Sequence, residues 1–167
     1  MKLLKNLFGI RPKNQPEPPK SIESLLMIED RDLYFVLSKA PKDKQRRVAA
    51  AVARHATGRV DLQNPILRDA LSRLERNEDI TPEMISAVSR LVDDLDLKND
   101  RLQIENDDKP VKHPSVPFVQ ARAASSVAAA LSGKVDEAVY EAIHASQDLP
   151  KIRQITLTIL KEGIRPV

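Results

Sequence analysis

Glu141 and His144 are the residues whose types and spacing best suit metal chemistry. They form a Glu-x-x-His pair inside a segment with helical apolar spacing, which places both side chains on one helix face. Carboxylate-bridged metal bundles take this pair from two helices and add further glutamates. The positions 75 residues earlier, where the chain resembles itself, hold Ile66 and Asp69, so the second half of such a site is missing. We therefore expect no metal, and we keep a metal-dependent protein using Glu141 and His144 as a second alternative.

Few other side chains offer catalytic chemistry. The chain has no cysteine and three histidines, which excludes disulfides and thiolate metal sites. His55 lies near the end of an expected helix, where a positive charge suits the helix dipole, and His113 stands in a proline-rich segment. The four glycines are isolated, so no phosphate-binding loop is present. We predict no catalytic residue, no cofactor and no enzyme activity.

The charges are unevenly distributed along the chain. Residues 39–59 carry seven Lys or Arg against one Asp, whereas residues 75–108 carry eleven Asp or Glu against four Lys or Arg. Cations near a helix N-terminus oppose the helix dipole, so a sequence that keeps them there has a use for them. We predict that they bind an acidic protein or the acidic region. The candidate interaction surface comprises Lys42, Lys44, Arg46, Arg47, Arg54 and Arg59.

Binding of nucleic acid through residues 39–59 is the first alternative. Phosphate contacts by this segment would give strongly salt-dependent affinity. Only 3% of the residues are aromatic, so stacking on bases is poorly supported, and the acidic region would repel phosphates. A protein partner is therefore the favoured prediction.

Helical spacing of apolar residues recurs along the chain, and an all-α fold follows. Residues 22–38 predict one helix or two short ones, and two clear helix starts follow at Asn64-Pro65 and Thr81-Pro82. Phe, Tyr and Trp are too few to form the core, so Ala, Leu, Ile and Val must form it. Six further helices are predicted at 42–57, 62–76, 81–97, 117–132, 136–147 and 150–162.

The chain resembles itself at an offset of 75 residues. Between 45–74 and 120–149, ten of thirty positions are identical, among them Gln45 with Gln120 and Arg47 with Arg122. These two matches suggest a structural task at each helix start. The pattern predicts two related three-helix units that form a helical bundle or a short stack with HEAT-like shape.

A turn is predicted at the same place in each unit. Gly58 and Gly133 are expected to end one helix, and Asp61 and Asp136 to cap the next. The duplication hypothesis predicts that Gly58 overlays on Gly133.

Proline-rich segments divide the chain. Residues 1–20 read as a disordered or extended tether, 21–98 as the first helical unit, 99–116 as a proline- and charge-rich linker and 117–167 as the second unit, with one shared core. Within the linker, residues 101–105 alternate in polarity as a short strand would. No apolar run is long enough to span a membrane, although residues 1–10 could contact its surface.

These observations favour a cytoplasmic, bacterial-type protein without catalysis. We predict a protein-interaction module, such as an adaptor or an immunity protein, that binds another protein through charged helix surfaces. Self-association is compatible with the charge polarity of the chain.

Overall fold

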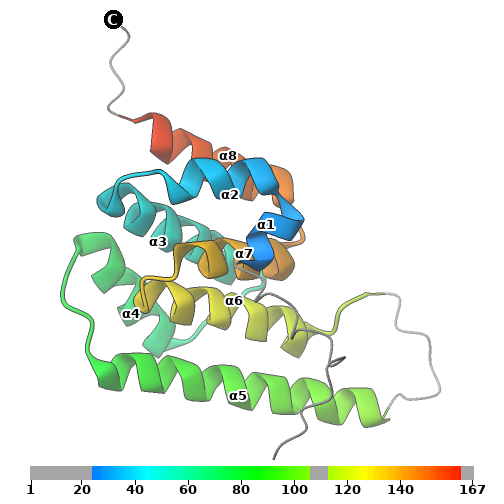
Figure 1. Cartoon of the computed structure of the whole chain (residues 1–167). Helices are drawn as coiled ribbons and strands as arrows, with labels where there is room; N and C mark the ends of the chain where they lie inside the picture. The colour runs from blue at the N-terminus through cyan, green and yellow to red at the C-terminus, as the bar shows by residue number, and fades with distance from the viewer. Residues whose placement is uncertain (1–23, 106–112, 163–167) are drawn as a thin grey trace, which may run out of the picture.

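The computed structural model describes residues 24–105 and 113–162, and all regular elements within these ranges are α-helices (Figure 1). The helices pack against one another, so the all-α, bundle-like fold predicted from the sequence is confirmed. In chain order they are α1 (Leu25–Glu29), α2 (Arg31–Ser38), α3 (Lys42–Arg59), α4 (Pro65–Arg76), α5 (Pro82–Glu105), α6 (Val116–Leu131), α7 (Val135–Ser146) and α8 (Leu149–Lys161).

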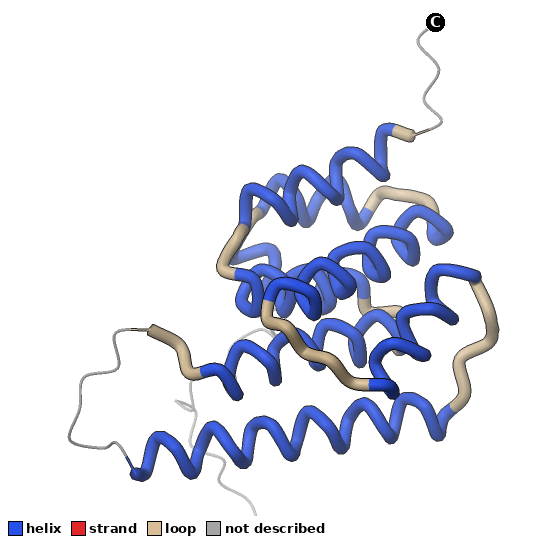
Figure 2. Tube along the Cα trace, turned by 180° about the vertical axis from the view of Figure 1, so that it is seen from behind, coloured by secondary structure: helices blue, strands red, loops and turns tan. Residues whose placement is uncertain are grey.

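Three helices form the centre of the molecule. Helices α6 and α7 run antiparallel through a short turn, and α3 packs against both. Helix α5 lies along α6 on one side, while α8, α2 and α1 cover α3 and α7 on the other. Seen from the front and from behind, α5 forms an outermost layer of its own (Figures 1 and 2).

Small side chains make this close packing possible. Alanines of α3, α6 and α7 are almost fully buried where these helices meet, for example Ala53, Ala124 and Ala138. Ala combines high helix propensity with little bulk, so the backbones approach closely. Larger apolar residues such as Leu33 and Ile152 fill the region under α2 and α8.

Polar caps set most of the helix starts. Asn64 Oδ1 accepts a hydrogen bond from the backbone N–H of Ile66 at 2.8 Å, directly before Pro65. Thr81 and Ser115 likewise cap α5 and α6 through their hydroxyls, with proline in the first turn of each. The starts predicted from Asn64-Pro65 and Thr81-Pro82 are therefore confirmed.

Asp30 decides between the two alternatives for the first helical segment. It interrupts the segment, and its side chain accepts a hydrogen bond from the backbone N–H of Leu33 at 2.9 Å. The segment therefore forms the two short helices α1 and α2. The predicted N-terminal tether lies outside the described residues, as do residues 1–10.

Helix α5 is longer than predicted. The sequence placed the end of the helix near residue 98 and a possible strand at 101–105, but α5 continues to Glu105. The apolar spacing persists on the face toward α6, where buried Asn99 Oδ1 accepts a hydrogen bond from the Ser115 hydroxyl at 2.6 Å. The charged linker residues that belong to α5, Asp100, Arg101 and Glu105, are exposed, and residues 106–112 of the predicted linker lie outside the described residues.

The predicted turn residues need correction. Gly58 lies inside α3 and does not end it; the left-handed residue after this helix is Asp61, with φ 49°. Gly133 does adopt the left-handed conformation, with φ 72°, and it follows Ser132, the C-cap of α6. Asp61 is therefore not a cap of α4, and Asp136 lies in the first turn of α7, after the cap position held by Lys134.

The turns after α3 and α6 are alike in structure, but they pair different residues from those that the internal sequence similarity pairs. After α3, the backbone N–H of Leu62 bonds to Thr57, and after α6 that of Lys134 bonds to Ala129, so both turns have the same hydrogen-bond pattern. That pattern equates Asp61, rather than Gly58, with Gly133. The predicted overlay of Gly58 on Gly133 is wrong at the level of the turn.

Glycine replacements should separate the two positions. Gly58→Ala should raise the unfolding free energy by about 0.5–1 kcal/mol, because Gly58 is helical and no atom lies within 4 Å of an added Cβ. Gly133→Ala should lower it by about 1 kcal/mol because of its positive φ. Urea denaturation measures both changes, and a stabilising Gly133→Ala would contradict the turn geometry.

Across residues 24–105 and 113–162, no helix combines the length and the apolar character needed to cross a bilayer.

Candidate functional site

The cations at the start of α3 reach the ends of other segments. Lys44 Nζ donates hydrogen bonds to the backbone carbonyls of Leu160 and Glu162, each at 2.6 Å. These carbonyls end α8, where the helix dipole is negative. Lys44 therefore opposes the dipole of its own helix but complements that of α8, and the second effect explains its position.

Further members of the basic segment are engaged in the same way. Arg46 donates to the backbone carbonyl of Glu78 at 2.7 Å, which ties α3 to the connection between α4 and α5. Arg47 pairs with Glu162, and Arg54 forms a two-point ion pair with Glu75.

Gln45 is the buried centre of this region. Its Nε2 donates to the carbonyl of Leu37, in the last turn of α2, at 3.0 Å and to that of Ala40, just after α2, at 3.1 Å, and its Oε1 accepts from Lys42 Nζ at 3.1 Å. The structural task suggested for Gln45 is thus present: the side chain satisfies carbonyls at the end of α2.

The residues of the candidate interaction surface therefore fall into two groups. Lys42, Lys44, Arg46, Arg47 and Arg54 all bond to other parts of their own chain. Arg59 is exposed at the end of α3 and makes no hydrogen bond or ion pair with the described residues.

Arg122 links three helices. On α6, it forms ion pairs with Asp96 of α5 at 3.0 Å and with Glu141 of α7 at 3.3 Å, and its guanidinium lies 5.7 Å from the Phe118 ring centre. The matching residue in the internal similarity, Arg47, forms an exposed pair instead.

Glu141 and His144 turn to different partners. The Glu141 carboxylate faces Arg122, whereas His144 lies against Tyr140, with ring centres 4.4 Å apart, and 3.9 Å from the Glu29 carboxylate. No group of three or more metal-ligating side chains occurs in the described part of the chain. The two residues thus do not form a shared site.

Burial raises the pKa of Glu141 above its ordinary value, and the positive charge of Arg122 partly offsets this shift. Its side chain is 12% exposed. Arg122 donates hydrogen bonds to both oxygens of this buried carboxylate. The Glu141 side chain therefore contributes to the packing of α7 on α6.

Lowering the pH should therefore stabilise the wild type relative to the Glu141→Gln variant. A group with a raised folded-state pKa contributes stability that is present below its unfolded pKa and is lost as pH rises through the folded pKa. Glutamine does not titrate, so the unfolding free energy of wild type relative to Glu141→Gln should increase as pH falls from neutrality toward 4. Urea denaturation at several pH values measures this difference, and a decrease would contradict the raised pKa.

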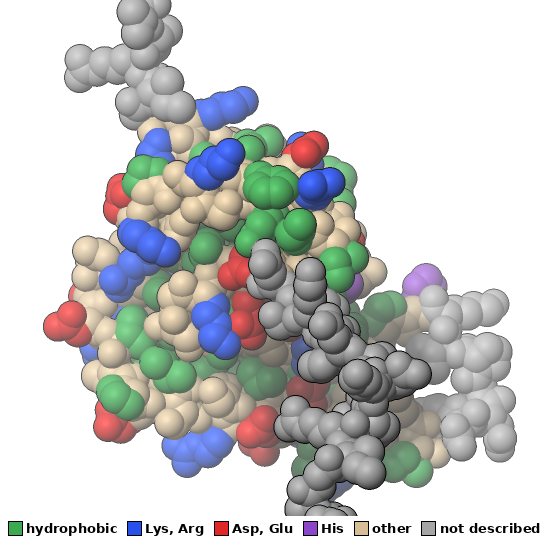
Figure 3. Space-filling view, in the orientation of Figure 1, with side chains coloured by type: hydrophobic (Ala, Val, Ile, Leu, Met, Phe, Trp, Pro, Cys, Tyr) green, Lys and Arg blue, Asp and Glu red, His purple; other side chains and the backbone are tan. Residues whose placement is uncertain are grey.

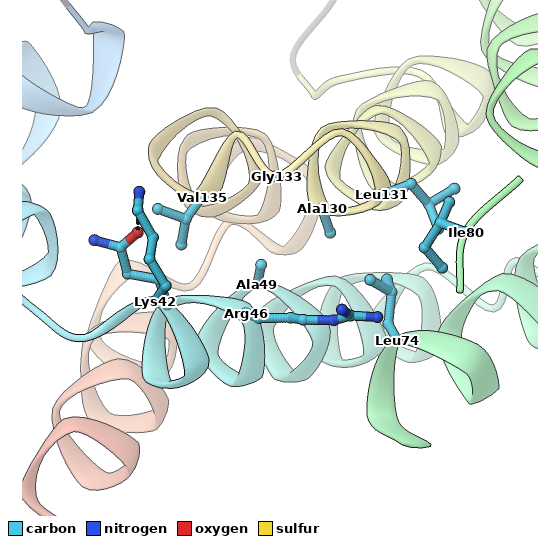
Figure 4. A pocket seen from close by; sticks show the side chains of 10 residues that line it. Lys42, Arg46, Ala49, Leu74, Ile80, Ala130, Leu131, Gly133 and Val135 are labelled. Atoms are coloured by element: carbon cyan, nitrogen blue, oxygen red, sulfur yellow. Dashed lines mark hydrogen bonds between the residues drawn. The ribbon is translucent and has the colours of Figure 1, made fainter. Parts of the chain in front are cut away.

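A pocket of about 230 Å³ lies between α3, the end of α4 and the α6–α7 turn (Figure 4). Its walls are largely apolar, from Ala49, Leu74 and Ile80, with Lys42 and Arg46 at the side. Because Lys42 bonds to Gln45 and Arg46 to Glu78, both cations already have partners inside the chain. The pocket contains no nucleophile paired with a base.

The outer face of α5 was missed by the sequence analysis. Helix periodicity places nine exposed side chains on the side opposite the face that packs on α6. Both acidic and basic side chains line the lower edge of the molecule, where α5 lies (Figure 3). We define this surface, the outer face of α5, as Glu83, Ser86, Arg90, Asp93, Asp94, Leu97, Asp100, Arg101 and Ile104.

Two features distinguish the outer face of α5. Leu97 is 50% exposed and Ile104 is 77% exposed, unusually open for large apolar side chains on one helix face. In the described structure, Asp93, Asp94, Asp100 and Arg101 form no ion pair, in contrast to the cations of α3. Exposed apolar groups among unpaired charges are typical of a protein-binding surface.

A second apolar area covers α1 and α2. Leu25, Ile28, Phe35 and Val36 are each at least 40% exposed there. Hydrophobic side chains gather in this region in the space-filling view (Figure 3). Its charges include Glu29, Asp32 and Arg31, the last of which lies over the Phe35 ring.

Comparisons of the chain with protein-family models, with curated proteins and with solved structures found no match.

Proposed function

We propose that this protein is a non-enzymatic interaction module that binds protein through the outer face of α5. The observation that supports the proposal most directly is the coincidence, on one exposed helix face, of Leu97 and Ile104 with charges that have no partner in the described structure. Adaptors and immunity-type proteins act in this way, by presenting a rigid charged surface rather than a reactive group. The absence of cysteine fits a cytoplasmic, reducing environment.

The basic segment supports this proposal less well than the sequence suggested. Five of its six candidate cations bond within the chain, and a partner that took them over would have to break contacts that hold α2 and α8. The same engagement weakens the case for nucleic acid, because phosphate binding needs free cations. Arg59 is the member left for either role.

Capture experiments with matched variants test the proposal. A tagged chain is used to recover partners from native extract, with and without nuclease treatment, at low and at high salt. Leu97→Glu should remove the recovered proteins, because it places a charge at the centre of the surface. Two control variants should retain them. Arg68→Glu reverses an exposed charge on α4, and Val36→Glu replaces an exposed apolar side chain on α2 by a charged one.

Two results would count against the proposal. Recovery by Leu97→Glu equal to that of wild type would show that the outer face of α5 is not the binding surface. Salt-sensitive recovery of nucleic acid, lost in Arg59→Glu, would favour the nucleic-acid alternative instead.

A further inference from the structure

We propose that the pocket beside the start of α3 binds a small organic acid, which carries one carboxylate on an apolar body. The proposal goes beyond the protein-binding function, because this pocket lies between α3, the end of α4 and the α6–α7 turn, away from the outer face of α5. It follows from the make-up of the pocket walls and from the charges that line them.

Apolar side chains from several segments form most of the pocket. Figure 4 shows Ala49 of α3 and Ala130 of α6 pointing into the gap between these two helices. Leu74, Ile80 and Leu131 form one end of the pocket. A protein cavity of about 150 Å³ holds benzene, so a pocket of about 230 Å³ has room for about nine non-hydrogen atoms. The walls therefore suit the apolar body of a small molecule.

Two cations line the pocket, and nothing in the described structure neutralises their charge. Lys42 Nζ donates to the amide oxygen of Gln45, and Arg46 Nη2 donates to the backbone carbonyl of Glu78, so both acceptors are uncharged. Neither cation forms an ion pair with the described residues, and no carboxylate is among the described residues that line the pocket. The pocket thus carries two positive charges, which favour a negatively charged ligand.

Arg46 has donors left for such a ligand. A guanidinium offers five N–H groups, and the bond to Glu78 uses only the Nη2 atom of Arg46. The Arg46 Nε atom is buried and has no hydrogen-bond partner in the described structure. Buried donors in proteins are nearly always paired, so this N–H group suits a carboxylate oxygen bound in the pocket. The ligand can therefore bond to Arg46 while the contact between Arg46 and Glu78 stays in place.

Two helix starts add positive potential at the same pocket. Lys42 is the first residue of α3 and Val135 the first residue of α7, and neither helix has a side-chain cap. The N–H groups of a first helical turn carry partial positive charge. Asp136 lines an adjoining pocket beside Tyr34, where it would repel an anion. We therefore place the carboxylate beside Arg46 and the apolar body of the ligand against the apolar end of the pocket.

Other classes of small ligand fit the pocket less well. Phosphate or sulfate has oxygens on every side, and most of them would face apolar walls without a hydrogen-bond donor. A neutral apolar molecule would leave both cations without a counter-charge. One anionic group joined to an apolar body meets both requirements.

Titration of the purified full-length chain with benzoate tests the proposal, because benzoate has the expected size, an apolar ring and one carboxylate. In two-dimensional amide NMR spectra, the signals of Arg46, Ala49 and Gly133 should shift and saturate, with a Kd of about 1 mM or below. Benzyl alcohol and benzylamine carry a neutral or a positive group on the same ring, and they should bind more weakly by about tenfold or more. Acetate has no apolar body and should also bind weakly.

Matched variants locate the binding site. Arg46→Met should weaken benzoate binding by about tenfold or more, because the carboxylate loses its donor. Arg47→Met removes an exposed cation of the same helix that does not line the pocket, and it should leave binding unchanged. Ala130→Leu should also abolish binding, because it fills the pocket while both cations remain.

Several results would overturn the proposal. They are the absence of saturable shifts up to about 20 mM benzoate, well above the expected Kd, equal affinity for benzyl alcohol, shifts confined to α1 and α2, and equal affinity of wild type and Arg46→Met. The ligand titrations use the wild-type chain, so they decide the question even if a variant fails to fold. None of these results bears on the outer face of α5, which the capture experiments test separately.

Discussion

Replacing Gln45 with leucine is expected to lower the free energy of unfolding by about 1–3 kcal/mol, although leucine is apolar and of similar size. Gln45 is 6% exposed, and its amide satisfies the carbonyls of Leu37 and Ala40. Leucine would leave the Ala40 carbonyl without the Gln45 donor, at about 1–3 kcal/mol, whereas the Leu37 carbonyl still accepts from the backbone N–H of Ala40. Urea denaturation measures the loss.

Gln120→Leu is the matched control for this prediction. Gln120 occupies the corresponding position in the internal similarity, is half-buried and makes no side-chain hydrogen bond to the described residues. We expect its replacement to change stability by less than about 0.5 kcal/mol. Equal losses in the two variants would show that the capping of α2 by Gln45 contributes nothing.

Replacing Arg122 with methionine is expected to lower the unfolding free energy by about 2–3 kcal/mol. Breaking a buried ion pair costs about 3–5 kcal/mol, and the partial exposure of Arg122 and Asp96 reduces this value. The loss arises mainly at Glu141, which would remain buried without its cation. It is limited because Glu141 can take up a proton.

A double-mutant cycle isolates this cause. In the Glu141→Gln background, Arg122→Met should cost clearly less than in wild type, because no buried carboxylate is left behind. Arg47→Met, at the corresponding position, removes an ion pair whose side chains are 54% and 48% exposed, and should cost less than about 1 kcal/mol. Additive costs of Arg122→Met and Glu141→Gln would contradict the account.

The sequence predicted local features of the fold well. Helix starts at Asn64-Pro65 and Thr81-Pro82 depend on a cap and a proline that are adjacent in the chain, so they are visible without a structure. The Ala-rich core follows from composition and helical spacing, which also depend on near neighbours.

Helix ends were harder to predict for a physical reason. Gly58 was expected to end α3 because glycine tolerates positive φ, but the helix continues past it and Asp61 adopts that conformation. Similarly, α5 was expected to end at residue 97, but it continues through Asn99, which is buried and accepts a hydrogen bond from Ser115, to Glu105. Tertiary contacts decide where such helices end, and the helix propensity of the local sequence carries no information about those contacts.

The candidate site shows the same limit. The basic segment was identified correctly as unusual for a helix start, but its purpose depends on residues such as Leu160, which is 116 positions from Lys44. The outer face of α5 was missed because its charges suggested a linker rather than a helix. Once the residues after 98 are known to be helical, Leu97 and Ile104 fall on one face.

The central claim is that the cations of α3 serve the fold, whereas α5 serves protein binding. The most direct measurement attaches a photo-reactive crosslinker to a single introduced cysteine, either Leu97→Cys or Arg59→Cys, in the otherwise cysteine-free chain. After illumination in native extract, the account predicts protein adducts from position 97 and few from position 59. Adducts from position 59 with none from position 97 would contradict it.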